Sequence, residues 1–300
     1  MEYSREGRFL NIKVDSLYYE TIQDFFDALI PSKKVQHLLI QNKDILLDGN
    51  PVKRESDIAG LTLSVNLYPE DHETPERTDL QIDIVYEDEI LLVVNKPKEL
   101  LVHSDGNEEM TLTKMVWSHY ADTPYIRPLP IHRLDRNTSG LVVYSKSPVF
   151  QPILDKMLNE KQIRRYYLAF TEGIMEEGKS VTIDKPIGKD RHNSGRYVVA
   201  KNGQKALTKV RSLGCNKKNN YSVLRCALDT GRTHQIRVHL SSIGYPILND
   251  DLYGRPSKLC IRMGLLADYL EFFHPLKEES LSVDSPLPND LSELYFRAVK

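Results

Sequence analysis

One aspartate with an arginine close by on each side is the residue in this sequence best placed to do chemistry. Asp135 lies between Arg133 and Arg136, within the stretch 131–140. Prolines before this stretch, and Asn, Thr, Ser and Gly at its end, predict irregular backbone that leads into a strand over 141–145. Since a neighbouring guanidinium lowers the pKa of a carboxylate, such a loop presents an ionised group that can act as a nucleophile. The alternative for an arbitrary Arg-x-Asp-Arg is a structural ion pair on the surface, and most surface ion pairs do little.

The same loop carries a family resemblance. The residues 132–135, His-Arg-Leu-Asp, followed by Thr-Ser-Gly at 138–140, resemble the catalytic motif of the RluA-type pseudouridine synthases. These enzymes convert uridine in RNA to pseudouridine. Four further stretches match the family in the same order and at similar spacing, and the resemblance covers about residues 80–296. The four are Tyr86–Pro97, Arg165–Ala169, Thr230–His239 and Leu270–Pro275.

The resemblance implies a role for each of three catalytic residues. Asp135 matches the aspartate on which the family's mechanism is built, and Arg237 matches the arginine that pairs with it. Tyr167 matches the active-site tyrosine of the family's Lys-x-Tyr-x-Ala segment, in which Arg165 here replaces the lysine. On residue type alone, Arg237 could equally face solvent at a helix N-terminus, and Tyr167 could be packed in the core.

The resemblance also implies RNA contacts. A base inside an RNA helix must be extruded before an enzyme can reach it, and something must fill the gap. Arg133 matches the family residue that enters the RNA stack, and Ile236 matches the apolar residue that packs against the flipped base. His132 is expected to position its neighbours rather than act as an acid or base. Arg232, in the same matched stretch as Ile236, is assigned to RNA binding.

Making pseudouridine requires breaking the glycosidic bond, turning the uracil and joining its carbon 5 to the sugar. No redox or phosphoryl step occurs, so no cofactor is expected. The carboxylate can attack the sugar or the ring, or it can stabilise an oxocarbenium-like centre, and the sequence leaves these routes open. A metal site is not expected, because His234 and His239 do not share a helix face and the cysteines lack C-x-x-C spacing.

Two other classes of function were weighed. The first is an inactive RNA-binding or ribosome-assembly protein on the same scaffold, which the match at every catalytic position disfavours. The second is a glycoside hydrolase, whose chemistry usually needs a pair of acids, whereas Asp135 stands among arginines. The expected partner is therefore RNA, either ribosomal or transfer RNA. The family members are commonly monomers.

Composition and charge agree with a cytoplasmic RNA enzyme. Of 300 residues, 40% are hydrophobic and 27% charged, which is typical of globular proteins. No apolar run reaches membrane-spanning length, and the first residues lack a signal-peptide core, so no membrane role is expected. The net charge is −2, but the charges are segregated. Residues 184–237 hold thirteen Lys and Arg against three acids, and 70–89 hold nine acids against one Arg. A one-signed basic block around a candidate site predicts a polyanion footprint.

Three segments are expected along the chain. Residues 1–68 form a small unit in which two helices, at 21–30 and 34–41, precede a hairpin at 45–52 and a strand at 61–67. This order resembles the RNA-binding module named after ribosomal protein S-four, and a docking subdomain without RNA contact is an equal alternative. Residues 69–79 are an acidic, proline-containing linker.

Residues 80–300 form the catalytic domain, of α+β class. Short spacings between its strands favour antiparallel pairing, and the family's fold is a mixed, mostly antiparallel sheet with an active-site cleft across its middle. Thr233 is expected to cap a helix ending near Ser242, with Gly244 in a left-handed conformation after it. The remaining elements are helices at 111–120 and 149–161 and strands at 82–86, 90–94, 165–171, 197–200, 206–213 and 221–228.

Overall fold

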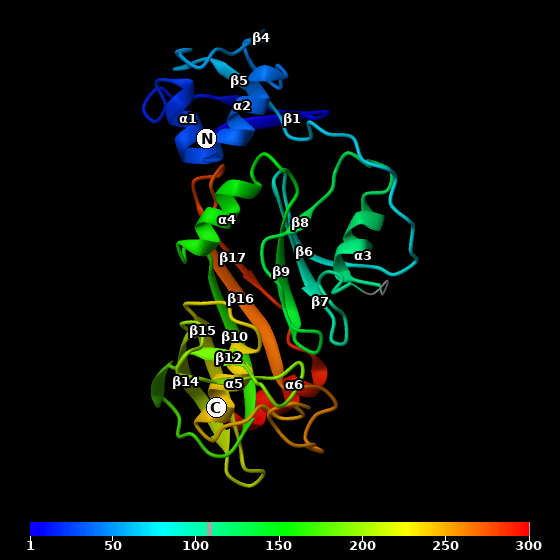
Figure 1. Cartoon of the computed structure of the whole chain (residues 1–300), viewed down its shortest axis with the longest axis vertical. Helices are drawn as coiled ribbons and strands as arrows, with labels where there is room; N and C mark the ends of the chain where they lie inside the picture. The colour runs from blue at the N-terminus through cyan, green and yellow to red at the C-terminus, as the bar shows by residue number, and fades with distance from the viewer. Residues whose placement is uncertain (107–109, 300) are drawn as a thin grey trace.

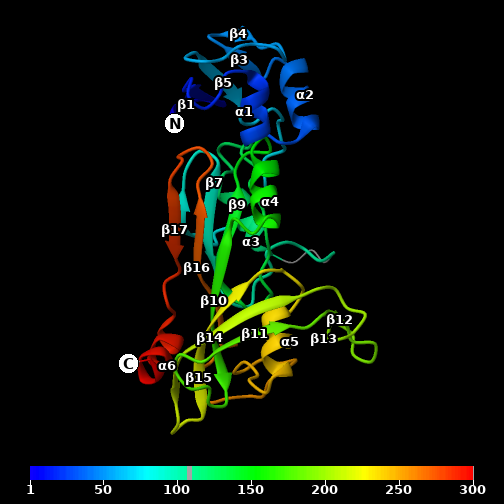
Figure 2. The same cartoon turned by 90° about the vertical axis from the view of Figure 1, so that its left-hand side faces the viewer.

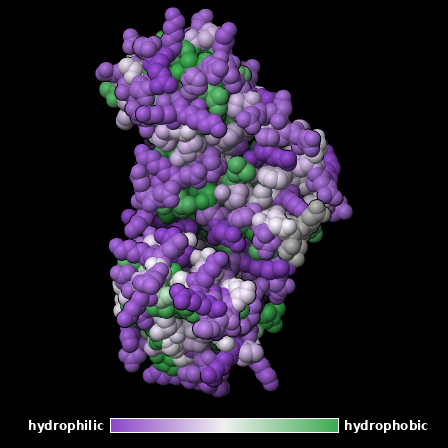
Figure 3. Space-filling model, in the orientation of Figure 1, coloured by the Kyte–Doolittle hydropathy of each residue, from purple (hydrophilic) through white to green (hydrophobic). Residues whose placement is uncertain are grey.

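The chain forms an elongated molecule with a small unit at one end of a long twisted sheet (Figure 1). The computed structural model describes residues 1–106 and 110–299. Its surface is mainly hydrophilic in the view of Figure 3, with scattered hydrophobic patches. Within the described ranges, no helix combines the length and the apolar character that crossing a bilayer requires.

The N-terminal unit is a five-stranded sheet covered by two helices. The predicted helices and the hairpin are confirmed, and the hairpin turns at Asp48 and Gly49, which both have positive φ (46° and 81°) as a type I′ turn requires. The two strands at the start of the chain were not predicted. The strand order is β1-β2-β5-β3-β4. The elements are β1 (Glu2–Glu6), β2 (Phe9–Lys13), α1 (Ile22–Leu29), α2 (Lys33–Gln41), β3 (Ile45–Leu47), β4 (Asn50–Pro51) and β5 (Thr62–Asn66).

The rest of the chain is built on a ten-stranded sheet with the order β11-β14-β15-β10-β16-β9-β7-β6, in which β17 pairs with β16 and β8 with β9. Among the described strands of this sheet, β16 and β9 are the parallel neighbours and the other pairs are antiparallel. The expected α+β class is confirmed. The strands are β6 (Asp83–Glu87), β7 (Leu91–Lys96), β8 (Leu129–Pro130), β9 (Ser139–Ser145), β10 (Arg164–Glu172), β11 (Ser180–Asp184), β14 (Leu207–Asn216), β15 (Tyr221–Leu228), β16 (Leu265–Phe273) and β17 (Ser280–Asp284).

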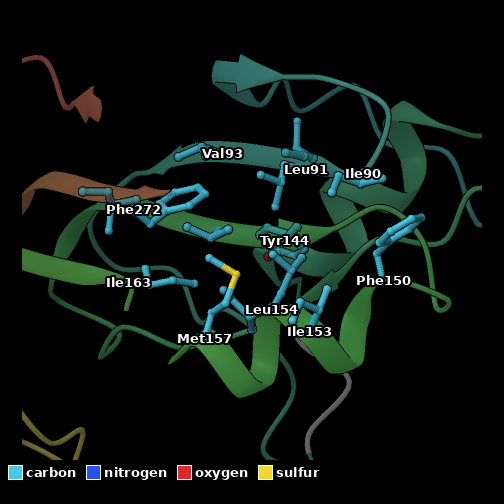
Figure 4. Packing of buried hydrophobic residues seen from close by; sticks show 14 of the residues in the cluster. Ile90, Leu91, Val93, Tyr144, Phe150, Ile153, Leu154, Met157, Ile163 and Phe272 are labelled. Atoms are coloured by element: carbon cyan, nitrogen blue, oxygen red, sulfur yellow. The ribbon is translucent and has the colours of Figure 1, made fainter. Parts of the chain in front are cut away.

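Helices cover both faces of this sheet. In Figure 2, α3, α4 and α5 lie on one side, together with a separate hairpin of β12 and β13, and α6 lies on the other. Leu154 and Met157 of α4 pack against Tyr144 and Leu91 of the sheet (Figure 4). The elements are α3 (Leu112–His119), α4 (Gln151–Asn159), β12 (Ile187–Lys189), β13 (Tyr197–Val199), α5 (Gln235–Ser242) and α6 (Asn289–Ala298).

The parallel pair of β9 and β16 depends on a glycine. Gly140 has φ +112°, and a Cβ atom there would lie 2.1 Å from the carbonyl oxygen of Ala267 on β16. No side chain fits at that distance, so the backbones can approach only because residue 140 is glycine. This contact seats the end of the Asp135 loop against β16.

The N-terminal unit docks directly on the sheet. The Ser147 hydroxyl donates to the carbonyl of Leu67 at 2.7 Å in a buried position. The buried ring of Tyr68 lies 5.4 Å from that of Tyr125, and the Arg8 guanidinium lies 4.6 Å from the Tyr125 centroid. The following residues 69–79 carry no helix or strand.

Candidate active site

All seven residues assigned from the sequence line one cavity of about 500 Å³. The cavity lies where the Asp135 loop, β10, the end of α4 and the start of α5 meet. Residues far apart in the chain, such as Asp135 and Arg237 at a separation of 102 positions, are brought to this place by the order of the strands in the sheet. The seven are His132, Arg133, Asp135, Tyr167, Arg232, Ile236 and Arg237.

Asp135 lies in the loop between β8 and β9. Its side chain is 22% exposed, and its backbone carbonyl accepts a hydrogen bond from the Thr138 amide at 3.1 Å. Arg237 reaches it from α5, with 3.4 Å between Nη1 and Oδ2. The expected proximity of the two residues is therefore present in the structure.

Arg237 is buried rather than facing solvent. Its side chain is 4% exposed, and it forms ion pairs with Asp250 and Asp251 in addition to Asp135. Burial lowers the pKa of Arg237, but the hydrogen bonds and charge of Asp250, followed by the charges of Asp135 and Asp251, raise it above its ordinary value. The guanidinium therefore stays charged beside Asp135.

The start of α5 differs from the expectation. The residue before its first turn is His234, which has a left-handed conformation with φ 55° and makes no capping bond through its side chain. Thr233 is therefore not the cap. The Gln235 carboxamide oxygen instead accepts from the Arg232 amide at 3.0 Å and from the Thr230 hydroxyl at 2.7 Å. The expected left-handed Gly244 is confirmed, with φ +85°.

Tyr167 enters the cavity from β10. It is 4% exposed, and burial raises the pKa of its phenol, while the charge of Arg165 offsets part of the rise. The phenol is therefore protonated near neutral pH. Tyr166, one residue earlier, faces the other side of the strand and donates to Glu271 at 3.3 Å, as the alternation of side chains in a strand predicts.

Comparison with known proteins agrees with this geometry. A family model described as RNA pseudouridylate synthase matches residues 90–242, just over half of the chain. The chain belongs to the RNA pseudouridylate synthase family. It is therefore an RNA isomerase with a pseudouridine synthase fold.

Individual relatives agree with the family model. An uncharacterized RNA pseudouridine synthase of Bacillus subtilis, YhcT, is 38% identical over 218 residues, which are 71% of this chain and 71% of the relative. The ribosomal large subunit pseudouridine synthase D of Haemophilus influenzae is 36% identical over 264 residues, 81% of this chain and 79% of the relative. The solved structure of human RNA Pseudouridylate Synthase Domain Containing 1 is 27% identical and matches with a TM-score of 0.58. The match covers 70% of this chain and 86% of the human chain.

In this pseudouridine synthase, His132 is part of the framework of the Asp135 loop. Its Nε2 accepts a hydrogen bond from the Val143 amide at 3.2 Å. Burial, together with the charge of Arg165, lowers the pKa of His132 to about 3. The imidazole is therefore neutral at physiological pH, which agrees with a positioning role.

The residues assigned to RNA contact lie at the mouth and wall of the cavity. Arg133 is exposed, and its Nη1 lies 3.3 Å from Nε2 of His103. Arg232 is also exposed, and its Nε donates to the carbonyl of Lys205 at 3.1 Å. Ile236 is 4% exposed and forms an apolar part of the cavity wall.

Two residues without an assigned role also support the site of this synthase. Asp250 is fully buried beside Arg237. Lys96, at the end of β7, is fully buried and donates to three carbonyls, those of Pro97, Leu100 and Arg136, at 2.9, 2.7 and 3.0 Å. Because Arg136 directly follows Asp135, Lys96 ties the Asp135 loop to the sheet. Lys96 belongs to a matched stretch, whereas no sequence pattern pointed to Asp250.

Proposed function

We propose that this synthase isomerises specific uridines in structured ribosomal RNA, with Asp135 as the nucleophile acting on a flipped-out base. The observation that carries the proposal is the position of the Asp135 carboxylate in the wall of the cavity, 3.4 Å from the charged Arg237 guanidinium. A guanidinium held next to a carboxylate orients it for attack.

In this proposal Arg237 and Tyr167 act on the same reacting centre. Arg237 holds Asp135 in place through their ion pair. Tyr167 offers a protonated phenol and an aromatic ring, which can stack on the uracil and hand on a proton. The reaction has no net redox change and transfers no phosphoryl group, so it requires no cofactor. The carboxylate can attack either the sugar or the ring.

The proposed RNA contacts account for access to the base. The volume of about 500 Å³ lies in the range of sites that enclose a small ligand. Arg133, exposed at the mouth, is suited to fill the gap that an extruded uridine leaves. Ile236 offers an apolar surface to the flipped base, and Arg232 is suited to contact phosphate. His132 holds the loop that carries Arg133 and Asp135.

Ribosomal RNA is the substrate that the relatives favour, because the protein of Haemophilus influenzae is named for the large ribosomal subunit. Transfer RNA is the second candidate within the same chemistry. An enzyme that modifies either RNA would act in the cytoplasm. The three free cysteines among the described residues agree with this location, because thiols stay reduced there.

We also propose a domain organisation in which residues 80–300 form the catalytic domain. Residues 1–68 form an accessory unit, which the linker 69–79 joins to it. The buried bond between Ser147 and Leu67 supports rigid attachment of this unit. An RNA-binding role for it rests on its resemblance to the S-four module.

The proposal is tested by measuring tritium release from carbon-5-labelled uridine in transcripts of large-subunit ribosomal RNA and of transfer RNA. Asp135→Asn keeps the side-chain volume and removes the charge, so we expect a folded protein that binds RNA and forms no pseudouridine. Asp122→Asn, at a surface position 85% exposed, is the matched control. Residual turnover of Asp135→Asn within about tenfold of wild type, roughly 1.4 kcal/mol of barrier, would mean that another group is the nucleophile.

A further inference from the structure

The guanidinium of Arg237 is oriented by a carboxylate other than Asp135. Its Nε and Nη2 donate to the two oxygens of Asp250, each at 2.8 Å. Its Nη1 reaches Asp135 at the longer distance of 3.4 Å. A bidentate pair between arginine and carboxylate is stronger and more closely defined in geometry than a single long contact. The direction in which Nη1 points is therefore set by Asp250.

Asp250 is itself fixed by the turn that contains it. Its side chain is fully buried, and Oδ1 also accepts from the amides of Leu252 and Tyr253 at 3.0 and 3.1 Å. The turn closes tightly at Gly254, where a Cβ atom would lie 2.4 Å from the carbonyl oxygen of Ile247. The turn therefore holds the carboxylate through Oδ1 independently of Arg237.

A buried guanidinium without Asp250 would have a different preferred partner. Arg237 is 4% exposed, and leaving part of a buried charge unpaired is costly. Asp251, which is 63% exposed, and Asp135 would then be the carboxylates within reach, and the Nη1 and Nη2 edge of the buried guanidinium could turn onto Asp135 to donate two parallel bonds. Such a pair would engage both of its oxygens, and a nucleophile needs one of them free.

We propose that Asp250 is a positioning residue for the isomerisation: it holds the Nε and Nη2 edge of Arg237, so that a single N–H group, on Nη1, faces Asp135 and the second oxygen of Asp135 remains available to the uridine. This inference rests on the proposed role of Asp135 as nucleophile. Asp250 does not line the cavity, so it acts through Arg237 and not on the substrate.

The first test is Asp250→Asn, which keeps the shape and the acceptor for the two backbone amides but removes the charge and one acceptor. We expect the single-turnover rate on a tritium-labelled large-subunit ribosomal RNA transcript to fall about 10- to 100-fold, as is usual when a residue that orients a directly acting group is lost. KM should stay within about twofold of the wild-type value. Asp251→Asn is the matched comparison. Asp251 bonds the same Nη2 at 2.9 Å but is 63% exposed, so its loss should slow the reaction about threefold or less.

A double variant separates positioning from a merely structural role. Lysine at position 237 cannot form two parallel bonds. If Asp250 acts through Arg237, adding Asp250→Asn to Arg237→Lys slows the reaction no further. Losses that multiply would overturn the inference. Should Asp250→Asn fail to fold, Asp250→Glu, which displaces the carboxylate by one methylene, carries the same expectation for rate and KM.

A spectroscopic measurement decides the question without substrate. The Nε–H group of Arg237 gives a nitrogen-15 signal that can be assigned by its absence in Arg237→Lys. We expect it to exchange slowly with solvent in wild type, Asp135→Asn and Asp251→Asn, and quickly in Asp250→Asn. Slow exchange in Asp250→Asn would overturn the inference. Absence of tritium release by the wild type from either RNA would refute the proposed function instead, and the exchange measurement would still test the role of Asp250.

Discussion

Replacement of Lys96 by Met is expected to destabilise the fold and to slow catalysis, because Lys96 secures the Asp135 loop from within the sheet. Met has nearly the same length and removes the ammonium group. The carbonyls of Pro97, Leu100 and Arg136 then lose their common donor in a buried position. The Arg136 carbonyl adjoins Asp135, the proposed nucleophile, so its release allows Asp135 to move relative to Arg237.

The size of the effect follows from two opposing contributions. Each carbonyl left without a donor costs about 1–3 kcal/mol, which gives a gross loss of several kcal/mol for three. Relief from burying the ammonium offsets part of this loss. Removing one partner from a buried charged network costs about 3–5 kcal/mol in other proteins. We therefore expect Lys96→Met to lower the free energy of unfolding by about 2–4 kcal/mol near pH 7.

The same substitution has a pH signature. Burial lowers the pKa of Lys96 to about 7, and the charge of Asp135 offsets part of the shift. Between pH 7 and the ordinary value of 10.5, the unfolded chain binds this proton and the folded chain does not. Folding stability therefore rises with pH in this window, by up to about 1.4 kcal/mol per pH unit. The variant lacks this contribution, so its deficit relative to wild type should grow from pH 7 to pH 9.

The assay is urea unfolding of both proteins at pH 6.5, 7 and 9 together with single-turnover rates. Lys98→Met is the control, since Lys98 is partly exposed and pairs with Glu99 at the surface; its loss should cost about 1 kcal/mol or less. A deficit of Lys96→Met below about 1 kcal/mol that stays constant with pH would refute the role assigned to the buried amino group of Lys96.

Three further outcomes are expected. Gly140→Ala places a methyl group against Ala267 and should destabilise the fold by more than about 4 kcal/mol. The control Gly178→Ala, at φ +77° in open space, should destabilise it far less, and thermal unfolding measures both effects. Removing residues 1–75 should leave a folded domain that binds RNA more weakly with a shallower salt dependence; an unchanged slope would indicate a docking role alone. Arg133→Ala should slow single-turnover modification of a paired target more than of an unpaired one, and equal losses would move Arg133 to the ordinary phosphate contacts.

The sequence predicted elements whose signal is local. The helix 22–29 has apolar residues at helical spacing, and the residues Asp48 and Gly49 alone specify the turn of the hairpin. The start of the chain gave no such signal. In the strand Glu2–Glu6 the side chains are at most half-buried, so apolar alternation is weak there even though the backbone pairs.

The candidate site was predictable only through the family resemblance. Asp135 and Arg237 are 102 positions apart, and no spacing rule connects them. The sequence does not predict a role for Asp250, because that role depends on burial and on a bidentate bond that only the folded turn creates. The Thr233 cap was wrong for a related reason: the residue before the first turn is His234, in a left-handed conformation, and the Gln235 side chain bonds the Arg232 amide that precedes it.

The parallel step between β9 and β16 also has a consequence for the order of assembly. In the sheet, β16 lies between β9 and β10 and joins the half that contains β6 and β7 to the half that contains β14 and β15. A growing chain makes β9 and β10 long before β16, so an edge of β10, and the part of β9 that β8 does not pair, can associate with other chains until β16 arrives. Pairings of such long sequence separation form slowly. Asp135 and Arg237 are carried by opposite halves, so the two residues that we propose to act together come into contact late in folding.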